Sequence, residues 1–296
     1  MRTLKLTVAY DGAAYVGWQR QARGSSIQGL LEAALLAIEG APVAVVGAGR
    51  TDAGVHALGQ VASVQLRHQI TPGALIRAVN ARLPPDIRVV TAVLASEPFH
   101  ARFDATAKTY RYRLLHGSVT SPFGRRHGWH VAETLDHERM ADAGLVLVGT
   151  HDFAAFQATG SSTPTTVRTL FDLTVGRVSP DPWSLDGGTG SAVTIIEARG
   201  NGFLRHMVRV VVGTLVEVGR GQRDGADVER VLRTGDRGEA GPTAPPHGLF
   251  LVRVEYPRGD SSGEQSGQPG VAAEVSGRRN PGGGGRASEA SGSASG

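Results

Sequence analysis

The sequence contains no cysteine, and this absence excludes several kinds of chemistry at once. Disulfide bonds, thiol catalysis and zinc or iron–sulfur centres held by cysteine are all ruled out. No apolar run approaches the ~20 residues that a membrane-spanning helix needs. The first nine residues alternate polar with apolar side chains and do not form the apolar block of a signal peptide. We therefore expect a cytoplasmic protein with no membrane segment.

Lysine is nearly absent as well. Of the 31 Lys and Arg residues, only Lys5 and Lys108 are lysines, so the net charge of +4 is carried almost entirely by arginine. Guanidinium groups match the geometry of phosphate and stack on bases, which makes a nucleic acid a candidate partner. An ordinary soluble enzyme that uses arginine in place of lysine explains the same composition, so charge alone leaves both possibilities open.

The composition changes sharply after Tyr256. Residues 257–296 include 19 Gly or Ser, and their four Arg are balanced by four acidic residues. Such a segment has too little apolar surface to offset its ordering entropy, so we predict a disordered tail. The remaining 256 residues suit one large or two medium domains, and we divide them into halves at 1–104 and 105–256.

Within residues 1–256, alternating patterns typical of strands are mixed with helical periodicity. We predict helices over 27–38 (with Ser26 as the cap and Gly40 as the end), 72–83, 136–148, 203–218 and 227–233. Strands are predicted over 4–10, 43–46, 61–66, 87–94, 109–115, 168–178, 192–199 and 250–256, and a hairpin loop over 181–190. Because strands and helices do not alternate strictly, the pattern favours an α+β fold, with a mixed, mainly antiparallel sheet and helices on one face.

The most unusual segment is the glycine-rich stretch from Gly47 to Gln60. It carries a single carboxylate, Asp52, with Arg50 two residues before it and His56 four residues after it. A lone carboxylate at a loop tip is suited to act as a nucleophile, a base or a metal ligand. The stretch lacks the Gly-Lys-Ser/Thr of a Walker loop, the third glycine of a dinucleotide fingerprint and the clustered ligands of a metal site. From the residues alone, a catalytic Asp and a tight turn whose Asp caps a following amide both remain open.

Six blocks of sequence together resemble a known family. Asp52 lies in GRTDAGVHA, which resembles the signature of TruA-type tRNA pseudouridine synthases. The other blocks are similar to segments of the same family and keep its order: YDGAAYVGWQRQ followed by SIQGLLE, FHARFDATAKTYRYRL, HDFAAFQ, GNGFLRHMVRVVVGTL and APPHGLFLVRVEY. The resemblance spans residues 1–256.

This resemblance implies the pseudouridine synthase fold, in which two ferredoxin-like halves form the sheet. It assigns the catalytic carboxylate to Asp52, the aromatic ring that packs against the target base to Tyr110, the partner of Asp52 to Arg209, and an RNA contact to Arg50. The family isomerises uridines at positions thirty-eight to forty in the anticodon stem-loop of tRNA, with no cofactor and no metal. It acts as a homodimer in which one tRNA contacts both subunits.

Arg209 is linked to Asp52 by a second argument, which does not use the resemblance. It is flanked by Val208, Val210 and Val211 in the predicted helix, where a charged side chain is costly to bury unless it is paired. We therefore expect a carboxylate beside it. Paired in this way, Asp52 would have a depressed pKa and stay ionised near neutral pH, which is the form that a nucleophile or base needs.

RNA binding requires further cations. Arg205 and His206 precede Arg209 by four and three residues, so on a helix they would share its face and could reach phosphate, although plain solvent exposure explains them equally well. Further candidates for phosphate contacts are Arg20, Arg23, Arg50, Arg77, Arg82, Arg111, Arg113, Arg125 and Arg126. Taken by itself, Tyr110 is typical of a core strand residue.

Several alternatives stay open at this point. The same reaction on another RNA, a non-catalytic RNA-binding or tRNA-folding protein, and a phosphate- or nucleotide-binding enzyme using the loop at Gly47–Gly54 are the competing functions. The last of these lacks both the Walker and the dinucleotide pattern. For Asp52 itself, attack at C1′, addition at C6 and removal of a ribose proton are all compatible with the residues.

Overall fold

One mixed sheet runs through the whole chain. The computed structural model describes residues 1–95, 98–160, 163–178 and 193–257, so the predicted hairpin loop at 181–190 and nearly all of the predicted tail lie outside the described residues. Its strands are β1 (Arg2–Tyr10), β2 (Val46–Gly47), β3 (His56–Leu66), β4 (Ile87–Leu94), β5 (Ala107–Leu115), β6 (Trp129–His130), β7 (Gly149–Asp152), β8 (Val167–Val178), β9 (Val193–Gly200) and β10 (Leu249–Glu255). Its helices are α1 (Ile27–Glu39), α2 (Pro72–Asn80), α3 (His137–Leu145), α4 (Met207–Gly219) and α5 (Gly225–Thr234).

The two halves of the sheet share one topology. The strand order is β4-β1-β3-β10-β5-β9-β8-β7, with β2 pairing to β3 and β6 to β5. The first half therefore reads β4-β1-β3-β2, and the second reads β10-β5-β9-β8. The first half follows the order strand, helix, strand, strand, helix, strand along the chain, which is the ferredoxin-like arrangement. The second half follows the same order once the additional β6, β7 and α5 are set aside. Within each of these sets of four strands, neighbouring strands are antiparallel. The two halves join where β10 pairs with β3 in parallel.

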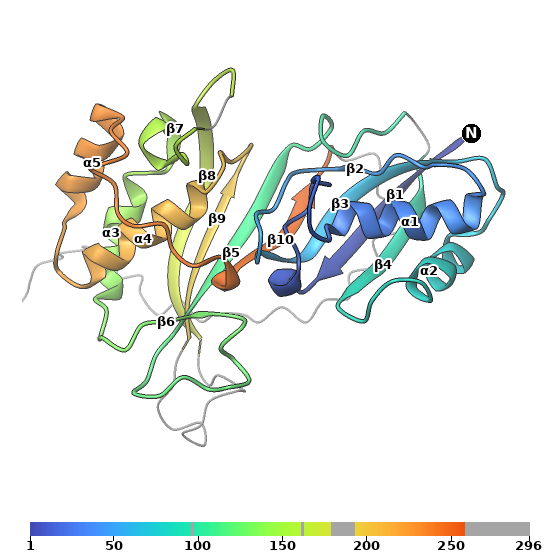
Figure 1. Ribbon diagram of the computed structural model, residues 1–296. Helices are drawn as coiled ribbons and strands as arrows, with labels where there is room; N and C mark the ends of the chain where they lie inside the picture. Colours follow the sequence, from blue (N-terminus) through green and yellow to red (C-terminus); the bar gives the residue numbers. More distant parts are fainter. Residues whose placement is uncertain (96–97, 161–162, 179–192, 258–296) are drawn as a thin grey trace, which may run out of the picture.

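Helices cover one face of this sheet, as the sequence predicted. In β1 the side chains of Leu4, Leu6, Val8 and Tyr10 are buried, whereas the intervening residues are only half-buried. Because side chains alternate between the faces of a strand, this pattern marks one packed face. Figure 1 shows α1 and α2 against the half with β1, β3 and β4, and α3, α4 and α5 against the half with β8 and β9. No helix in the described part of the chain is long and apolar enough to cross a membrane.

Element positions agree best with the prediction where local signals are strong. The strand predicted over 87–94 is β4, and the helix predicted from Ile27 begins there, because the Ser26 hydroxyl caps the Gly29 amide. The strand predicted over 43–46 reduces to β2 at Val46–Gly47, the helices predicted to end at 83 and 148 end at Asn80 and Leu145, and β6 and β7 lie where no strand was predicted. Two further elements begin later or earlier than expected. The strand predicted from Val61 already begins at His56, because residues 56 and 57 pair with β10. The helix predicted from Phe203 begins only at Met207, because His206 adopts a left-handed conformation with φ of 65°.

Two histidines of the second half share one buried hydroxyl. Nε2 of His116 and Nε2 of His137 each lie 2.7 Å from Oγ1 of Thr194, which is fully buried. Since Nδ1 of His116 faces the Val131 carbonyl oxygen at 3.2 Å, Nδ1 carries the proton and Nε2 accepts from the hydroxyl. Burial lowers the pKa of both histidines, and the charge of Arg177 lowers them further.

The stability of the fold should therefore fall on mild acidification. A lowered pKa in the folded state means that the unfolded chain, with an ordinary histidine pKa near 6.5, binds more protons in the range just below that value. Burial lowers the pKa of His56 in the same direction. We expect the free energy of unfolding, measured by urea titration at constant ionic strength, to be smaller at pH 5.5 than at pH 7.5. Equal or greater stability at pH 5.5 would contradict these histidine environments.

Candidate active site

The loop that carries Asp52 is fixed by the N-terminal segment of the chain. The buried residue before it, Thr51, accepts the Trp18 amide at 3.1 Å through its carbonyl, and its Oγ1 lies 2.8 Å from the Tyr10 hydroxyl. The two segments approach so closely that a Cβ at Gly17 would lie 2.5 Å from the Thr51 carbonyl oxygen. Gly17 also has φ of 106°, which side chains rarely allow. The backbone on which Asp52 is mounted is therefore rigidly placed.

The Asp52 carboxylate faces helix α4 in the other half of the molecule. Its Oδ2 lies 3.5 Å from a terminal nitrogen of Arg209 and 3.6 Å from Nε2 of His206. The side chain of Asp52 is 27% exposed and that of Arg209 is 12% exposed. Among the described residues, no backbone amide donates to this carboxylate, so Asp52 does not act as the turn cap that the sequence left open. The carboxylate partner expected for Arg209 is Asp52.

Arg209 is held from two sides. Its Nε donates a 2.7 Å hydrogen bond to the Ala244 carbonyl, and the other end of the guanidinium meets Asp52. A planar guanidinium can make both contacts at once, which the single ammonium of a lysine cannot do in this geometry. A second hydrogen bond fixes Ala244 to Arg209, because the Ala244 amide donates to the Arg209 carbonyl at 3.1 Å.

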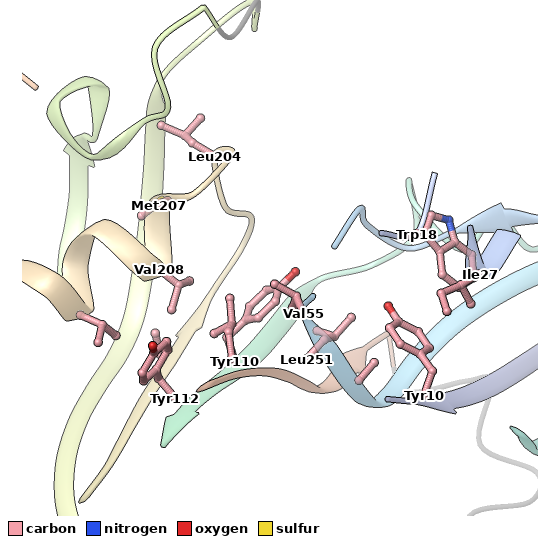
Figure 2. Close-up of a cluster of buried hydrophobic side chains, with 14 of the residues drawn as sticks. Tyr10, Trp18, Ile27, Val55, Tyr110, Tyr112, Leu204, Met207, Val208 and Leu251 are labelled. Atoms are coloured by element: carbon pink, nitrogen blue, oxygen red, sulfur yellow. The ribbon is translucent and has the colours of Figure 1, made fainter. Parts of the chain in front are cut away.

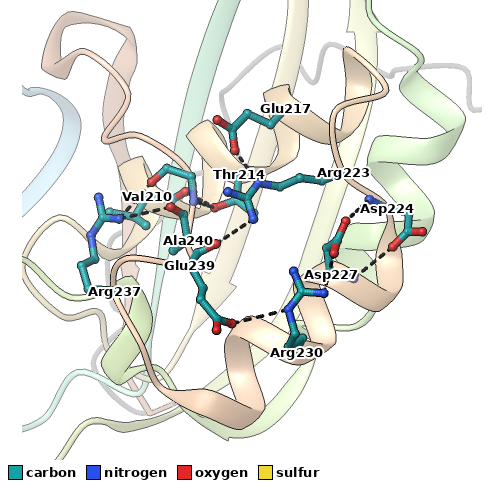
Figure 3. A network of polar contacts seen from close by, with 11 residues as sticks. Val210, Thr214, Glu217, Arg223, Asp224, Asp227, Arg230, Arg237, Glu239 and Ala240 are labelled. Carbon is teal, nitrogen blue, oxygen red and sulfur yellow. Dashed lines mark hydrogen bonds and ion pairs between the residues drawn. The ribbon is translucent and has the colours of Figure 1, made fainter.

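A polar network fixes the segment that leads to Ala244. Arg223, which follows α4, contacts Glu217 at 2.5 Å and donates to the Glu239 carbonyl at 2.6 Å, as Figure 3 shows. On the other side of the segment, Arg237 donates to the Gly241 carbonyl at 3.0 Å. These side chains hold the backbone after α5 against the end of α4.

The same segment passes directly over the middle of α4. Thr214 accepts the Gly241 amide at 2.9 Å through its hydroxyl oxygen. A Cβ at Gly213 would lie 1.8 Å from the Pro242 carbonyl oxygen, so only glycine permits this approach. The position of Ala244, and through it that of the guanidinium, depends on this packing.

Tyr110 lies on β5, beside the loop and α4. Figure 2 shows its ring between Val208 of α4 and Val55, which follows the Asp52 turn. The ring is 7% exposed and meets Phe203 edge-to-face, with the centroids 4.9 Å apart. Burial raises the pKa of Tyr110, and the charge of Asp52 adds to this, so the phenol stays protonated and can donate a hydrogen bond. Tyr110 is therefore a buried residue of β5, as the sequence suggested, and it also lies beside the loop that carries Asp52.

His206 lies against Asp52 and outside the helix, whereas the sequence predicted it on the helical face of Arg209 as a phosphate contact. It is the one non-glycine residue with positive φ among those described, and it comes directly before α4. Burial lowers the pKa of His206; the Asp52 carboxylate opposes this, and the nearby charges of Arg209 and Arg205 reinforce it. A left-handed conformation costs a side-chain-bearing residue roughly 1–2 kcal/mol, so a strained residue against the carboxylate points to a role at the site.

The arginines proposed as RNA contacts are distributed unevenly. Arg50 and Arg205 are exposed on either side of the Asp52–Arg209 pair, one in the loop and one before α4. Arg111 and Arg113 alternate with Tyr110 along β5, so they lie on the opposite face of the sheet, where Arg111 pairs with Glu197 at 2.8 Å. The exposed members of the remaining set are Arg20, Arg23, Arg77, Arg82, Arg125 and Arg126.

A second group of ionisable residues lies away from Asp52. Asp11, His56 and His127 bring one potential ligand atom each within 4.8 Å of one another, beside a hollow of about 470 Å³. The Nδ1 of His56 already accepts the Gly12 amide at 3.1 Å, and Oδ1 of Asp11 accepts the Ala13 amide at 3.0 Å. Because these lone pairs are used in hydrogen bonds, we interpret the group as a structural one that fixes the start of the chain to β3.

The geometry around Asp52 indicates an enzyme. A lone carboxylate held by a guanidinium across two ferredoxin-like halves, beside a protonated tyrosine, is a candidate enzyme site with one carboxylate available for the chemistry.

Comparison with known proteins identifies the family. The chain belongs to the tRNA pseudouridine synthase family, whose model matches residues 6–104 and 145–257. It is 44% identical over 256 residues to tRNA pseudouridine synthase A of Syntrophotalea carbinolica, covering 86% of this chain and 97% of that protein. The same enzyme of Geotalea uraniireducens and that of Myxococcus xanthus are each 44% identical over 256 residues, covering 86% of this chain and 100% and 92% of those proteins.

The strained backbone of His206 can be separated from its side chain by two substitutions. Both His206→Gly and His206→Ala remove the imidazole beside Asp52, but only glycine adopts φ of 65° without strain. We expect the glycine variant to be more stable to urea than the alanine variant by about 1 kcal/mol. Equal stability of the two variants would show that the left-handed conformation does not survive in solution.

Proposed function

We propose that this protein converts uridine to pseudouridine in tRNA, with Asp52 as the catalytic carboxylate. Its targets are uridines at positions thirty-eight to forty of the anticodon stem-loop. The observation that carries the proposal is the pairing of Asp52 with Arg209 beside Tyr110, three residues that come from three separate blocks of the sequence. The membership of the chain in the tRNA pseudouridine synthase family supports the same reaction.

The chemistry fits a site with one carboxylate. The bond from C1′ to N1 of uridine breaks, the uracil turns, C5 bonds to C1′, and the proton at C5 is replaced by one at N1. Nothing is oxidised and no group is donated, so the reaction itself requires no cofactor or metal. Asp52 performs its step as an anion, whether by attack at C1′, by addition at C6 or by removal of a ribose proton.

The neighbouring residues hold the reacting groups. Arg209 orients Asp52, since the Ala244 carbonyl fixes the other edge of its guanidinium. Tyr110 packs against the extruded uracil, and Phe203 supports the tyrosine ring edge-to-face. Stacking on an aromatic ring is worth ~1–3 kcal/mol per base, comparable with the cost of drawing a base out of a helix.

Binding of the whole tRNA requires a larger basic surface. Arg50 and Arg205 flank the site and contact the RNA backbone, and the shape of the stem-loop guides recognition more than its sequence does. We propose that two copies of the chain associate, so that one tRNA contacts both subunits. The site of action is the cytoplasm, where tRNA is processed.

Substitution of Asp52 separates catalysis from binding. In Asp52→Ala we expect no detectable pseudouridine in an anticodon-arm RNA, while the affinity for that RNA stays within about threefold, because the phosphate contacts that dominate affinity lie elsewhere. Pseudouridine is measured by mass spectrometry of the digested RNA, and affinity by filter binding.

The controls for this experiment exclude the competing functions. Asp172→Ala removes a carboxylate on β8 and should leave the rate unchanged. A normal rate in Asp52→Ala would disprove the mechanism. Binding of anticodon-arm RNA by the wild type, without any pseudouridine, would instead support a non-catalytic RNA-binding protein.

A further inference from the structure

One of the two lysines of the chain lies beside the site, without a role in the reaction. Lys108 belongs to β5, two residues before Tyr110, so both side chains are on the same face of the sheet. Residues two apart along a strand are separated by about 6.6 Å. Lys108 is thus a near neighbour of the ring that receives the base.

The lysine side chain packs against the loop that carries Asp52. A Cβ placed at Gly49 would lie 3.4 Å from Cε and 3.9 Å from Nζ of Lys108. Gly49 is three residues before Asp52, and its carbonyl accepts the Gln60 side-chain amide at 2.9 Å, which holds this part of the loop in place. The ammonium group therefore has a defined position next to the catalytic loop.

The surroundings of this ammonium are positive. Lys108 is half-buried, and within the described residues no carboxylate forms an ion pair with it. Arg102 and Arg168 lie close enough to act on it: burial lowers the pKa of Lys108, and the charges of these two arginines lower it further. Arg168 in turn reaches the loop before α4, since a Cβ at Gly202 would lie 3.6 Å from its Nε.

Lys108 pairs with Gly200, and Gly200 with Leu170, two residues after Arg168, so Lys108 and Arg168 lie on the same face of the sheet. A half-buried ammonium with no carboxylate partner and with other positive charges near it is unfavourable unless an anion joins them. The substrate of the proposed function supplies such an anion on each side of every nucleotide. We propose that Lys108, with Arg102 and Arg168, binds the phosphodiester adjoining the nucleotide that is turned out toward Asp52. This inference rests on the proposed function, and the ligand class is a phosphodiester of an RNA backbone.

Kinetics on an anticodon-arm RNA test the assignment. In Lys108→Gln we expect KM to rise by roughly 3- to 10-fold with kcat within about threefold of the wild type, and the slope of log affinity against log salt to fall by about one. Lys108→Arg should keep both KM and slope, because it retains the charge. Unchanged KM and slope in Lys108→Gln, or a loss confined to kcat, would overturn the proposal.

Lys5 provides the matched control, being the other lysine of the chain. Its ammonium lies 4.4 Å from the centre of the Tyr256 ring, so it already has a partner within the fold. Lys5→Gln should change neither KM nor the salt slope. The same loss in both variants would show that Lys108 contributes only to the general charge of the protein, which also contradicts the proposal.

A direct measurement avoids dependence on catalysis. Reductive methylation with ¹³C-formaldehyde labels the two lysines and the terminal amine and keeps their charge. On addition of anticodon-arm RNA to the Asp52→Ala chain, the Lys108 signal should shift and titrate at higher pH, whereas the Lys5 signal should not. If the RNA binds and the Lys108 signal does not shift, the proposed phosphate site is wrong, and the proposed function is unaffected. If the wild type forms no pseudouridine while Lys108 does shift, the proposed function fails and the phosphate site stands.

Discussion

The site depends on one ion pair that links the two halves of the molecule. Asp52 and Arg209 are separated by 157 positions in the sequence, yet their charged atoms lie 3.5 Å apart. Nothing local brings them together. The parallel pairing of β10 with β3 joins the two ferredoxin-like halves, and the network around Arg223 and Arg237 fixes the segment at Ala244. The partly buried guanidinium of Arg209 has one carbonyl and one carboxylate as partners, which offset the free-energy cost of its desolvation. Loss of either partner would leave part of that cost without compensation.

Charge around the site is divided between two tasks. The guanidinium of Arg209 faces the Asp52 carboxylate, so its charge is largely neutralised within the protein. Arg50, Arg205 and the group around Lys108 have no such neutralisation among the described residues, and their positive field is available to the backbone of a nucleic acid. This division pairs Asp52 with a cation while the surrounding surface attracts a polyanion.

Much of the fold could be predicted from the sequence, because its signals are local. The alternation of Leu4, Leu6 and Val8 marks a one-sided strand, and capping at Ser26 marks the start of α1. An arginine among valines predicted a carboxylate partner on the grounds of burial alone. The long signature around Asp52 then identified which carboxylate it was.

The missed features all arise from tertiary contacts. The helical periodicity of 203–218 gives no warning that His206 adopts a left-handed conformation before the helix, where its side chain meets Asp52 from a distant part of the chain. Strand β3 begins five residues before the predicted start at Val61, because its early residues pair with a strand from the far end of the chain. Lys108 carries no local signal, since its significance lies in the Gly49 backbone that it touches.

The most direct test of this account is a double-mutant cycle on the pair itself. Asp52→Asn, Arg209→Gln and the double variant are compared with the wild type by urea unfolding, at a pH where the wild-type carboxylate is ionised. If the two side chains are paired, the combined loss should differ from the sum of the single losses by ~0.5–3 kcal/mol. Additivity within about 0.3–0.5 kcal/mol would mean that the two groups do not interact, and the proposed site would be wrong.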